Sequence, residues 1–122
     1  MNKTLRILVV EDEVLVAFSL KVELTRAGYK VCGVAATADE AVSLALQHRP
    51  DVILMDIGLK GEKDGFDAAG AIYAVEFIPI VFVSGYLDDA NRARAAQFNP
   101  LACLGKPATL MQIKNSFAAL AK

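Results

Sequence analysis

The sequence has little cysteine, little net charge and no long apolar run, and each shortage excludes a class of protein. Its two cysteines, Cys32 and Cys103, lie in separate short apolar segments, so the chain has neither zinc-ligand spacing nor a disulfide framework. Thirteen basic and fourteen acidic side chains leave a net charge of −1, which provides no field for holding a nucleic-acid backbone or an anionic membrane. The apolar run 7–10 ends at Glu11, far too early for a signal peptide or a membrane span. We therefore expect a cytoplasmic protein with no direct contact to nucleic acid or membrane.

Apolar side chains are abundant. The chain has 122 residues, of which 55% are hydrophobic, and its mean hydropathy is +0.40. This length is typical of one domain, and this composition requires an interior that is large relative to the surface. Both features favour a sheet that is covered on its two faces.

Short apolar runs of strand length alternate five times with longer segments of helical periodicity. This alternation predicts a parallel sheet built from βαβ units, because such strands need helices as crossovers. The predicted strands are residues 6–10, 30–35, 52–55, 78–83 and 101–104. The predicted helices are residues 13–27, 37–48, a segment that follows Asp64-Gly65 and ends before Pro79, residues 88–97, and a last helix that begins after 107.

Two of the predicted helices carry informative residues. Thr37 and Glu40 have the spacing of a capping box at the start of the second helix. The fourth helix, 88–97, has few large apolar residues with which to pack, so we expect it to be the most mobile.

Polar residues follow four of the five predicted strands. Right-handed crossovers bring the carboxyl ends of parallel strands to one edge of a sheet, where open α/β folds bind their ligands. The residues at this edge are Glu11 and Asp12, then Asp56, then Ser84 and Gly85, and finally Gly105, Lys106 and Pro107. Three acids held together repel one another unless a cation neutralises them. An all-oxygen ligand set favours Mg²⁺.

Phosphoryl transfer is the chemistry that this group of residues fits. A carboxylate next to a metal can attack a phosphoryl group and form an acyl phosphate, and Asp56 ends the central strand. Mg²⁺ would neutralise one phosphoryl oxygen, Lys106 a second, and the Ser84 hydroxyl would donate to the third.

Four segments, in this order and at these spacings, resemble the motifs of response-regulator receiver domains of two-component systems. The segments are Val10-Glu11-Asp12-Glu13, Met55-Asp56-Ile57, Val83-Ser84-Gly85 and Gly105-Lys106-Pro107. The resemblance covers the whole chain and implies a single receiver domain, residues 1–122. It also implies the flavodoxin-like (βα)5 fold, a doubly wound five-stranded parallel sheet with strand order 2-1-3-4-5.

The resemblance implies a role for each residue at the sheet edge. The implied Mg²⁺ ligands are Glu11, Asp12, Asp56 and the backbone carbonyl of Gly58. Asp56 would be phosphorylated by a sensor histidine kinase or a histidine phosphotransfer protein, with Lys106 contacting the phosphoryl group and Ser84 acting as the switch hydroxyl. The peptide bond between Lys106 and Pro107 would be cis. Beyond reactions at Asp56 itself, the resemblance implies no enzyme activity.

One position departs from the common pattern of receivers. Many receivers have an aromatic switch residue three positions before the lysine, and here that position is Cys103. The segment 82–86 instead resembles a divergent stand-alone subfamily that carries Phe-Ala-Thr-Gly followed by a tyrosine. We hypothesise that Tyr86 substitutes for the missing aromatic residue.

The first helix has a second apolar stripe beside its expected core face, formed by Leu15, Phe18 and Val22. In receivers this helix meets the kinase, so the stripe is either a docking surface or more deeply buried than the sequence reveals. No output domain is visible. The chain would therefore act through a downstream protein partner, as a relay or a sink, or as one piece of a longer regulator. We expect a monomer or a weak dimer.

Other interpretations of the acids remain open at this stage. Glu11 and Asp12 alone would fit an ordinary helix N-terminus. The acids would also fit a Mg²⁺-dependent phosphohydrolase or a toprim-like metal enzyme, although these usually need Asp-x-Asp and here Gly58 lies two residues after Asp56. A flavodoxin-like cofactor binder would need a phosphate-cradling loop after the first strand, where this chain has acids.

Overall fold

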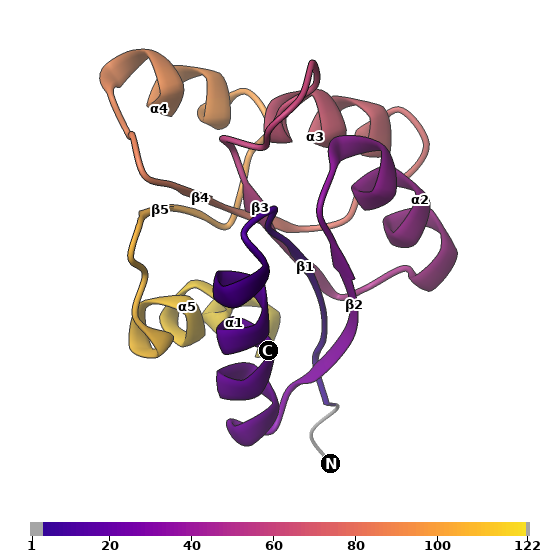
Figure 1. Ribbon diagram of the computed structural model, residues 1–122, viewed down its shortest axis with the longest axis vertical. Coiled ribbons are helices and arrows are strands. Elements are labelled where there is room, and N and C mark those ends of the chain that lie inside the picture. Colours follow the sequence, from indigo (N-terminus) through magenta and orange to yellow (C-terminus); the bar gives the residue numbers. More distant parts are fainter. Residues whose placement is uncertain (1–3, 122) are drawn as a thin grey trace.

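Five parallel strands form one sheet between two layers of helices (Figure 1) in the computed structural model, which describes residues 4–121. The strands are β1 (Arg6–Val10), β2 (Lys30–Ala35), β3 (Val52–Asp56), β4 (Ile80–Ser84) and β5 (Ala102–Gly105). The helices are α1 (Val14–Arg26), α2 (Ala38–His48), α3 (Gly65–Tyr73), α4 (Asp89–Ala96) and α5 (Leu110–Ser116), and a 3-10 helix η1 (Ala118–Ala121) follows. The strand order is β2-β1-β3-β4-β5, and every pair is parallel. The predicted flavodoxin-like fold and strand order are therefore confirmed.

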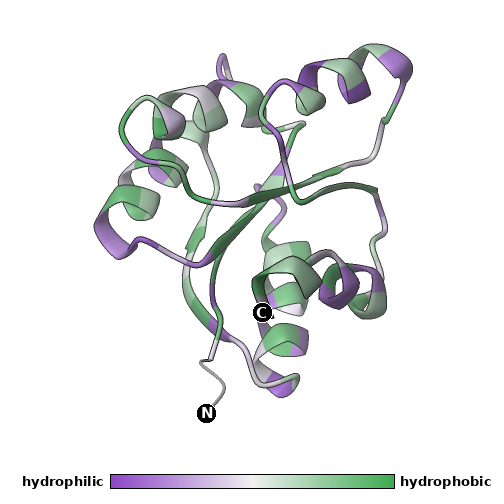
Figure 2. Ribbon diagram, turned by 180° about the vertical axis from the view of Figure 1, so that it is seen from behind, coloured by the Kyte–Doolittle hydropathy of each residue, from purple (hydrophilic) through white to green (hydrophobic). Residues whose placement is uncertain are grey.

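The two faces of the sheet carry separate apolar cores. Adjacent residues of a strand point to opposite faces, so Ile7 and Val9 of β1 lie in one core while Leu8 and Val10 lie in the other. The core with Ile7 is covered by α1 and α5, and the core with Leu8 by α2, α3 and α4 (Figure 1). Figure 2 shows the strands as the most continuously hydrophobic part of the chain. This pattern explains why the strand sequences show no polar alternation.

The structure corrects the bounds of two predicted elements by more than one residue. Helix α3 ends at Tyr73 instead of continuing to the residue before Pro79, and β4 begins at Ile80 instead of residue 78. Pro79 accepts a hydrogen bond from the Ile53 amide at 2.9 Å, but it has no amide hydrogen to donate. The ladder with β3 therefore starts at Ile80, and the ladder with β5 starts at Val81.

The predicted capping box of α2 is only half present. Thr37 Oγ1 accepts from the Glu40 amide at 3.1 Å, but the Glu40 carboxylate accepts from the Ala36 amide at 2.9 Å and not from Thr37. Complete capping boxes occur elsewhere, at the start of α3 and at the start of α5. Both stabilise the beginning of a helix that follows a loop of the candidate site.

The outer stripe of α1 is mostly exposed. Leu15 and Phe18 are 83% and 65% exposed, while Ala17 and Leu24 fill the core face of the helix. The interpretation that the whole stripe is buried is therefore wrong. Within residues 4–121, no helix is long and apolar enough to cross a membrane.

Candidate functional site

Three carboxylates meet at the carboxyl end of the sheet. Asp56 is the last residue of β3, and Glu11 follows β1 directly; the two strands are neighbours in which Val10 pairs with Met55. Glu11, Asp12 and Asp56 each place one oxygen within 4.8 Å of the others. Glu11 and Asp56 are only 3% and 5% exposed, and Asp12 is half-buried. The sheet topology thus brings residues 45 positions apart in sequence into one acidic cluster.

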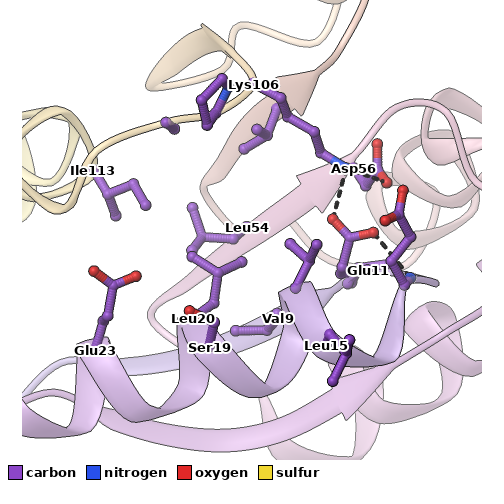
Figure 3. Close-up of a pocket in the computed structure, with 16 residues that line it drawn as sticks. Val9, Glu11, Leu15, Ser19, Leu20, Glu23, Leu54, Asp56, Lys106 and Ile113 are labelled. Atoms are coloured by element: carbon purple, nitrogen blue, oxygen red, sulfur yellow. Dashed lines mark hydrogen bonds and ion pairs between the residues drawn. The ribbon is translucent and has the colours of Figure 1, made fainter.

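Lys106 reaches this cluster from the loop between β5 and α5. Its Nζ donates to Glu11 Oε1 at 2.6 Å and to Asp56 Oδ2 at 2.9 Å (Figure 3). Burial alone would lower the pKa of Lys106, but the hydrogen bonds and the negative charges of Glu11 and Asp56 together outweigh burial and raise it. Burial raises the pKa of Glu11, and the bond from Lys106 offsets only part of this effect. One cation therefore serves two acids and leaves the cluster with excess negative charge.

Backbone amides orient all three carboxylates, and the Glu13 amide donates to Glu11 Oε2 at 3.0 Å. The Gly58 amide donates to Asp56 Oδ1 at 3.0 Å, and the Lys60 amide donates to Asp12 Oδ2 at 2.8 Å. Both donors belong to the loop that connects β3 with α3. Because charge-assisted bonds of this kind fix the acceptor strongly, the loop holds the acids in place. The described contact of Gly58 with the site comes from its amide, so metal binding by its carbonyl stays a prediction.

Gly65 shapes the site, although its position in the sequence does not reveal this role. A Cβ atom at this position would lie 2.3 Å from the Asp56 carbonyl oxygen and 2.9 Å from Ile57 Cα. The Gly65 amide also donates to the Ile57 carbonyl at 3.0 Å. The loop can return this close to β3 only because the residue has no side chain.

Ser84 lies at the end of β4 and is 5% exposed. Its hydroxyl donates to the Tyr86 carbonyl at 3.1 Å and accepts from the Tyr86 amide at 3.1 Å. Among the described contacts, none joins Ser84 to Asp56. The Tyr86 side chain is 71% exposed, whereas Cys103 is half-buried against the core beneath α2, α3 and α4. Among the described contacts, none therefore joins these three predicted switch residues to the acids.

The Lys106–Pro107 peptide bond is cis. A groove of about 560 Å³ runs from Glu11 and Lys106 along the space between α1 and α5 (Figure 3). Apolar side chains of both helices and of β3 form its walls, among them Leu15, Leu20, Leu54 and Ile113. The site is thus open to a partner along an apolar surface.

The donor set fits a hard divalent cation. Glu11, Asp12 and Asp56 provide only carboxylate oxygens, and such oxygens are the ligands that Mg²⁺ prefers. Among residues 4–121, Lys106 is the one lysine paired with these three acids, so a divalent ion would reduce the repulsion between them. The cluster can therefore hold a metal ion.

Comparison with known proteins decides the family. Residues 7–118 match the family of the response regulator receiver domain. This chain belongs to that family. The match assigns the chain to two-component signalling and places it outside the phosphohydrolase and toprim-like classes that its acids alone would also fit.

The relatives of this receiver domain agree with the family match. The transcriptional regulatory protein PdtaR of Mycobacterium tuberculosis is 34% identical over 108 residues, which cover 88% of this chain and 52% of that protein. The phyllosphere-induced regulator PhyR of Methylorubrum extorquens is 38% identical over 81 residues, which cover 66% of this chain and 30% of that protein. The chain therefore spans about half or less of the length of these relatives.

Solved receiver structures show the same architecture. The signal receiver domain of a modulated diguanylate cyclase from Desulfovibrio desulfuricans has a TM-score of 0.86 at 35% identity, covering 98% of this chain and 94% of that one. The receiver domain of the putative response regulator NarL from Mycobacterium tuberculosis has a TM-score of 0.87 at 26% identity, covering 98% and 97%.

Proposed function

We propose that this receiver domain accepts a phosphoryl group on Asp56 from a sensor histidine kinase or a histidine phosphotransfer protein. The observation that carries the proposal is the position of Lys106 Nζ, 2.9 Å from Asp56 Oδ2, inside a cluster of three acids. A lysine at this distance can neutralise a phosphoryl oxygen once the carboxylate carries the group. Receiver domains interact with histidine kinases, which agrees with a phosphohistidine as the donor.

In this reaction, a carboxylate oxygen of Asp56 forms a bond to phosphorus while the bond between phosphorus and the donor's imidazole nitrogen breaks. The electron pair of the broken bond stays on the imidazole. A divalent cation on Glu11, Asp12 and Asp56, which we propose to be Mg²⁺, would supply positive charge for the phosphoryl oxygens and the acids. Lys106 holds a second oxygen, and the Ser84 hydroxyl turns from Tyr86 toward the third. The backbone carbonyl of Gly58 is proposed as a further metal ligand.

The finer proposals concern the rest of the signal. The segment 82–86 supports the proposal that the chain is a member of the divergent stand-alone subfamily. We further propose that residues 1–122 form a single domain that is cytoplasmic and is a monomer or weak dimer. We also propose that the domain signals through changed contacts with a downstream protein. Tyr86 would act as the switch aromatic residue, because Cys103 stands at the position where many receivers have that residue. If so, Tyr86→Ala should leave phosphorylation of Asp56 intact and weaken the response of α4 to it.

The test is to incubate the chain with acetyl phosphate and to follow the intact mass. We expect one phosphoryl group per chain in Mg²⁺, none in excess chelator, and none in Asp56→Asn. Asp39→Asn is the matched control, because Asp39 is an exposed acid that pairs with Lys63 at 3.1 Å, away from the acidic cluster. Labelling that survives in Asp56→Asn, or that ignores the chelator, would refute the proposal.

A further inference from the structure

We infer that Asn91 links the Ser84 hydroxyl to helix α4 through one shared backbone carbonyl, that of Tyr86. The Tyr86 carbonyl accepts from Ser84 Oγ at 3.1 Å and from Asn91 Nδ2 at 2.9 Å. The Tyr86 amide donates to Ser84 Oγ at 3.1 Å. We call these three hydrogen bonds the Tyr86 latch. The inference rests on the proposed phosphorylation of Asp56 and extends it from the site to α4.

Helix α4 depends on this latch because little else holds its first turns. Ala95 is the buried residue of the helix, and the Arg94 guanidinium lies 4.4 Å from the centroid of the Phe66 ring. Both contacts belong to the second half of the helix. In the first half, Asp88 caps the Asn91 amide at 2.8 Å, a bond within the same segment. Leu87, directly before the cap, packs against the core, and the Asn91 side chain adds the described hydrogen bond that ties the start of α4 to the loop that follows β4.

The Ser84 hydroxyl has one hydrogen and can donate it to only one acceptor at a time. In the structure that acceptor is the Tyr86 carbonyl. When the hydroxyl donates to a phosphoryl oxygen on Asp56, the carbonyl keeps Asn91 as its side-chain donor and the loop is held less firmly. Phosphorylation thereby loosens the start of α4, which lies above β4 and β5 at the end of its helix layer (Figure 1).

The latch is tested by backbone amide hydrogen exchange in α4, without any phosphodonor. Asn91→Asp keeps the shape of the side chain but removes its donor, and Asn91→Ala removes the whole amide group. Both substitutions favour the helix itself, since an acid suits its first turn and alanine has the higher propensity. Faster exchange would therefore report the lost bond and not a weaker helix. We expect an increase of about two- to tenfold in both variants, in line with the net worth of one hydrogen bond.

Arg92→Ala is the control, because Arg92 is an exposed neighbour on the same helix with no part in the latch. Its exchange should stay close to that of the unaltered chain. Unchanged exchange in both Asn91 variants, or an equal increase in Arg92→Ala, would overturn the inference.

The link to Ser84 is tested by combining variants. Ser84→Ala removes one donor from the shared carbonyl, so it should increase α4 exchange in the unaltered chain but add little in the Asn91→Asp background. Strictly additive effects of Ser84→Ala and Asn91→Asp would show that the two side chains act independently and would contradict the latch.

Acetyl phosphate with Mg²⁺ then separates the inference from the proposed function. We expect it to label Asp56 equally in the unaltered chain and in Asn91→Asp. It should increase α4 exchange in the unaltered chain and at most half as much in the variant. Normal labelling with unchanged α4 exchange would refute the latch and leave the proposed function standing. Absence of labelling would refute the proposed function. The exchange measurements made without a phosphodonor would still decide the latch.

Discussion

At the scale of single residues, the position of Asp56 depends on the missing side chain of Gly65. We predict that Gly65→Ala destabilises the fold by about 1–3 kcal/mol, as overpacking does. An ideal Cβ at this position would lie only 2.3 Å from the Asp56 carbonyl oxygen, so the added atom would have to displace this carbonyl. Urea unfolding measures the free energy, and the yield of phosphorylation by acetyl phosphate reports the displaced carboxylate.

Gly70→Ala is the matched control for this prediction, because Gly70 lies in the same helix and its added Cβ would meet only Phe98 Cε1, at 4.0 Å. This variant should be neutral or more stable by up to about 1 kcal/mol, since alanine is the better helix former. Equal stability of the two variants would show that the close approach at Gly65 is relieved without consequence.

Cys32 and Cys103 allow a prediction about pH. Burial raises the pKa of both thiols. Because the thiolate is the reactive form, a raised pKa lowers its fraction at pH 8 and slows reaction. We predict that iodoacetamide modifies both residues more slowly than free cysteine at pH 8, and that the rates continue to rise above the pH at which free cysteine levels off. If both thiols of the folded chain reacted as fast as free cysteine, the prediction would be contradicted. In urea, where the chain is unfolded, we expect rates equal to that of free cysteine.

The sequence was enough to predict that one edge of the sheet carries Glu11, Asp12, Asp56 and Lys106. The strand ends of a parallel sheet converge whatever the details of the loops, so the position of each residue just after a strand was enough. The role of Gly65 could not be predicted, because it comes from a loop that folds back on β3. The hydrogen bonds to the Tyr86 carbonyl could not be predicted either, because they depend on loop backbone geometry, which apolar periodicity does not encode.

At the scale of elements, the exposed stripe of α1 shows what periodicity cannot decide. The sequence shows apolar residues on two sides of this helix, but burial depends on what packs against each side. The space beneath α1 is filled by Ala17 and Leu24, so Leu15 and Phe18 face outward. The docking interpretation therefore gains support from the structure, with the groove between α1 and α5 beside it.

We predict that Leu15→Lys changes the free energy of unfolding by less than about 0.5 kcal/mol, because the side chain is already exposed. Labelling by acetyl phosphate should be unchanged. Transfer from a phosphorylated histidine phosphotransfer protein that labels the unaltered chain should slow by about tenfold, the effect of losing an apolar contact worth about 1.4 kcal/mol.

Thr25→Lys provides the control for the added charge, since Thr25 is exposed near the other end of the same helix. It should leave transfer from the phosphorylated protein nearly unchanged. A marked loss of stability in Leu15→Lys would contradict the exposed position, and equal slowing in both variants would indicate a general effect of charge instead of a docking contact.

At the scale of the whole molecule, fold class and strand order could be predicted because two simple signals agreed: the fivefold alternation of elements and the motifs at the strand ends. The bounds were less accurate where a single residue overrides the pattern, as Pro79 does at the start of β4. Partition of the core into two halves follows directly from strand alternation. The same topology that buries these cores concentrates three acids at one end, so stability and metal binding should be linked.

We predict that Mg²⁺ stabilises the whole chain through this link. At ten times the Kd, binding to the folded state alone adds about 1.4 kcal/mol, which raises the Tm on the order of 5 °C for a domain of this size. Differential scanning calorimetry with MgCl₂, compared with KCl of equal ionic strength, measures the rise. Asp12→Asn should abolish it, since Asp12 belongs to the acidic cluster, whereas Asp39→Asn should retain it. A rise that KCl reproduces, or that persists in Asp12→Asn, would mean that the ion acts by general screening and not at the three carboxylates.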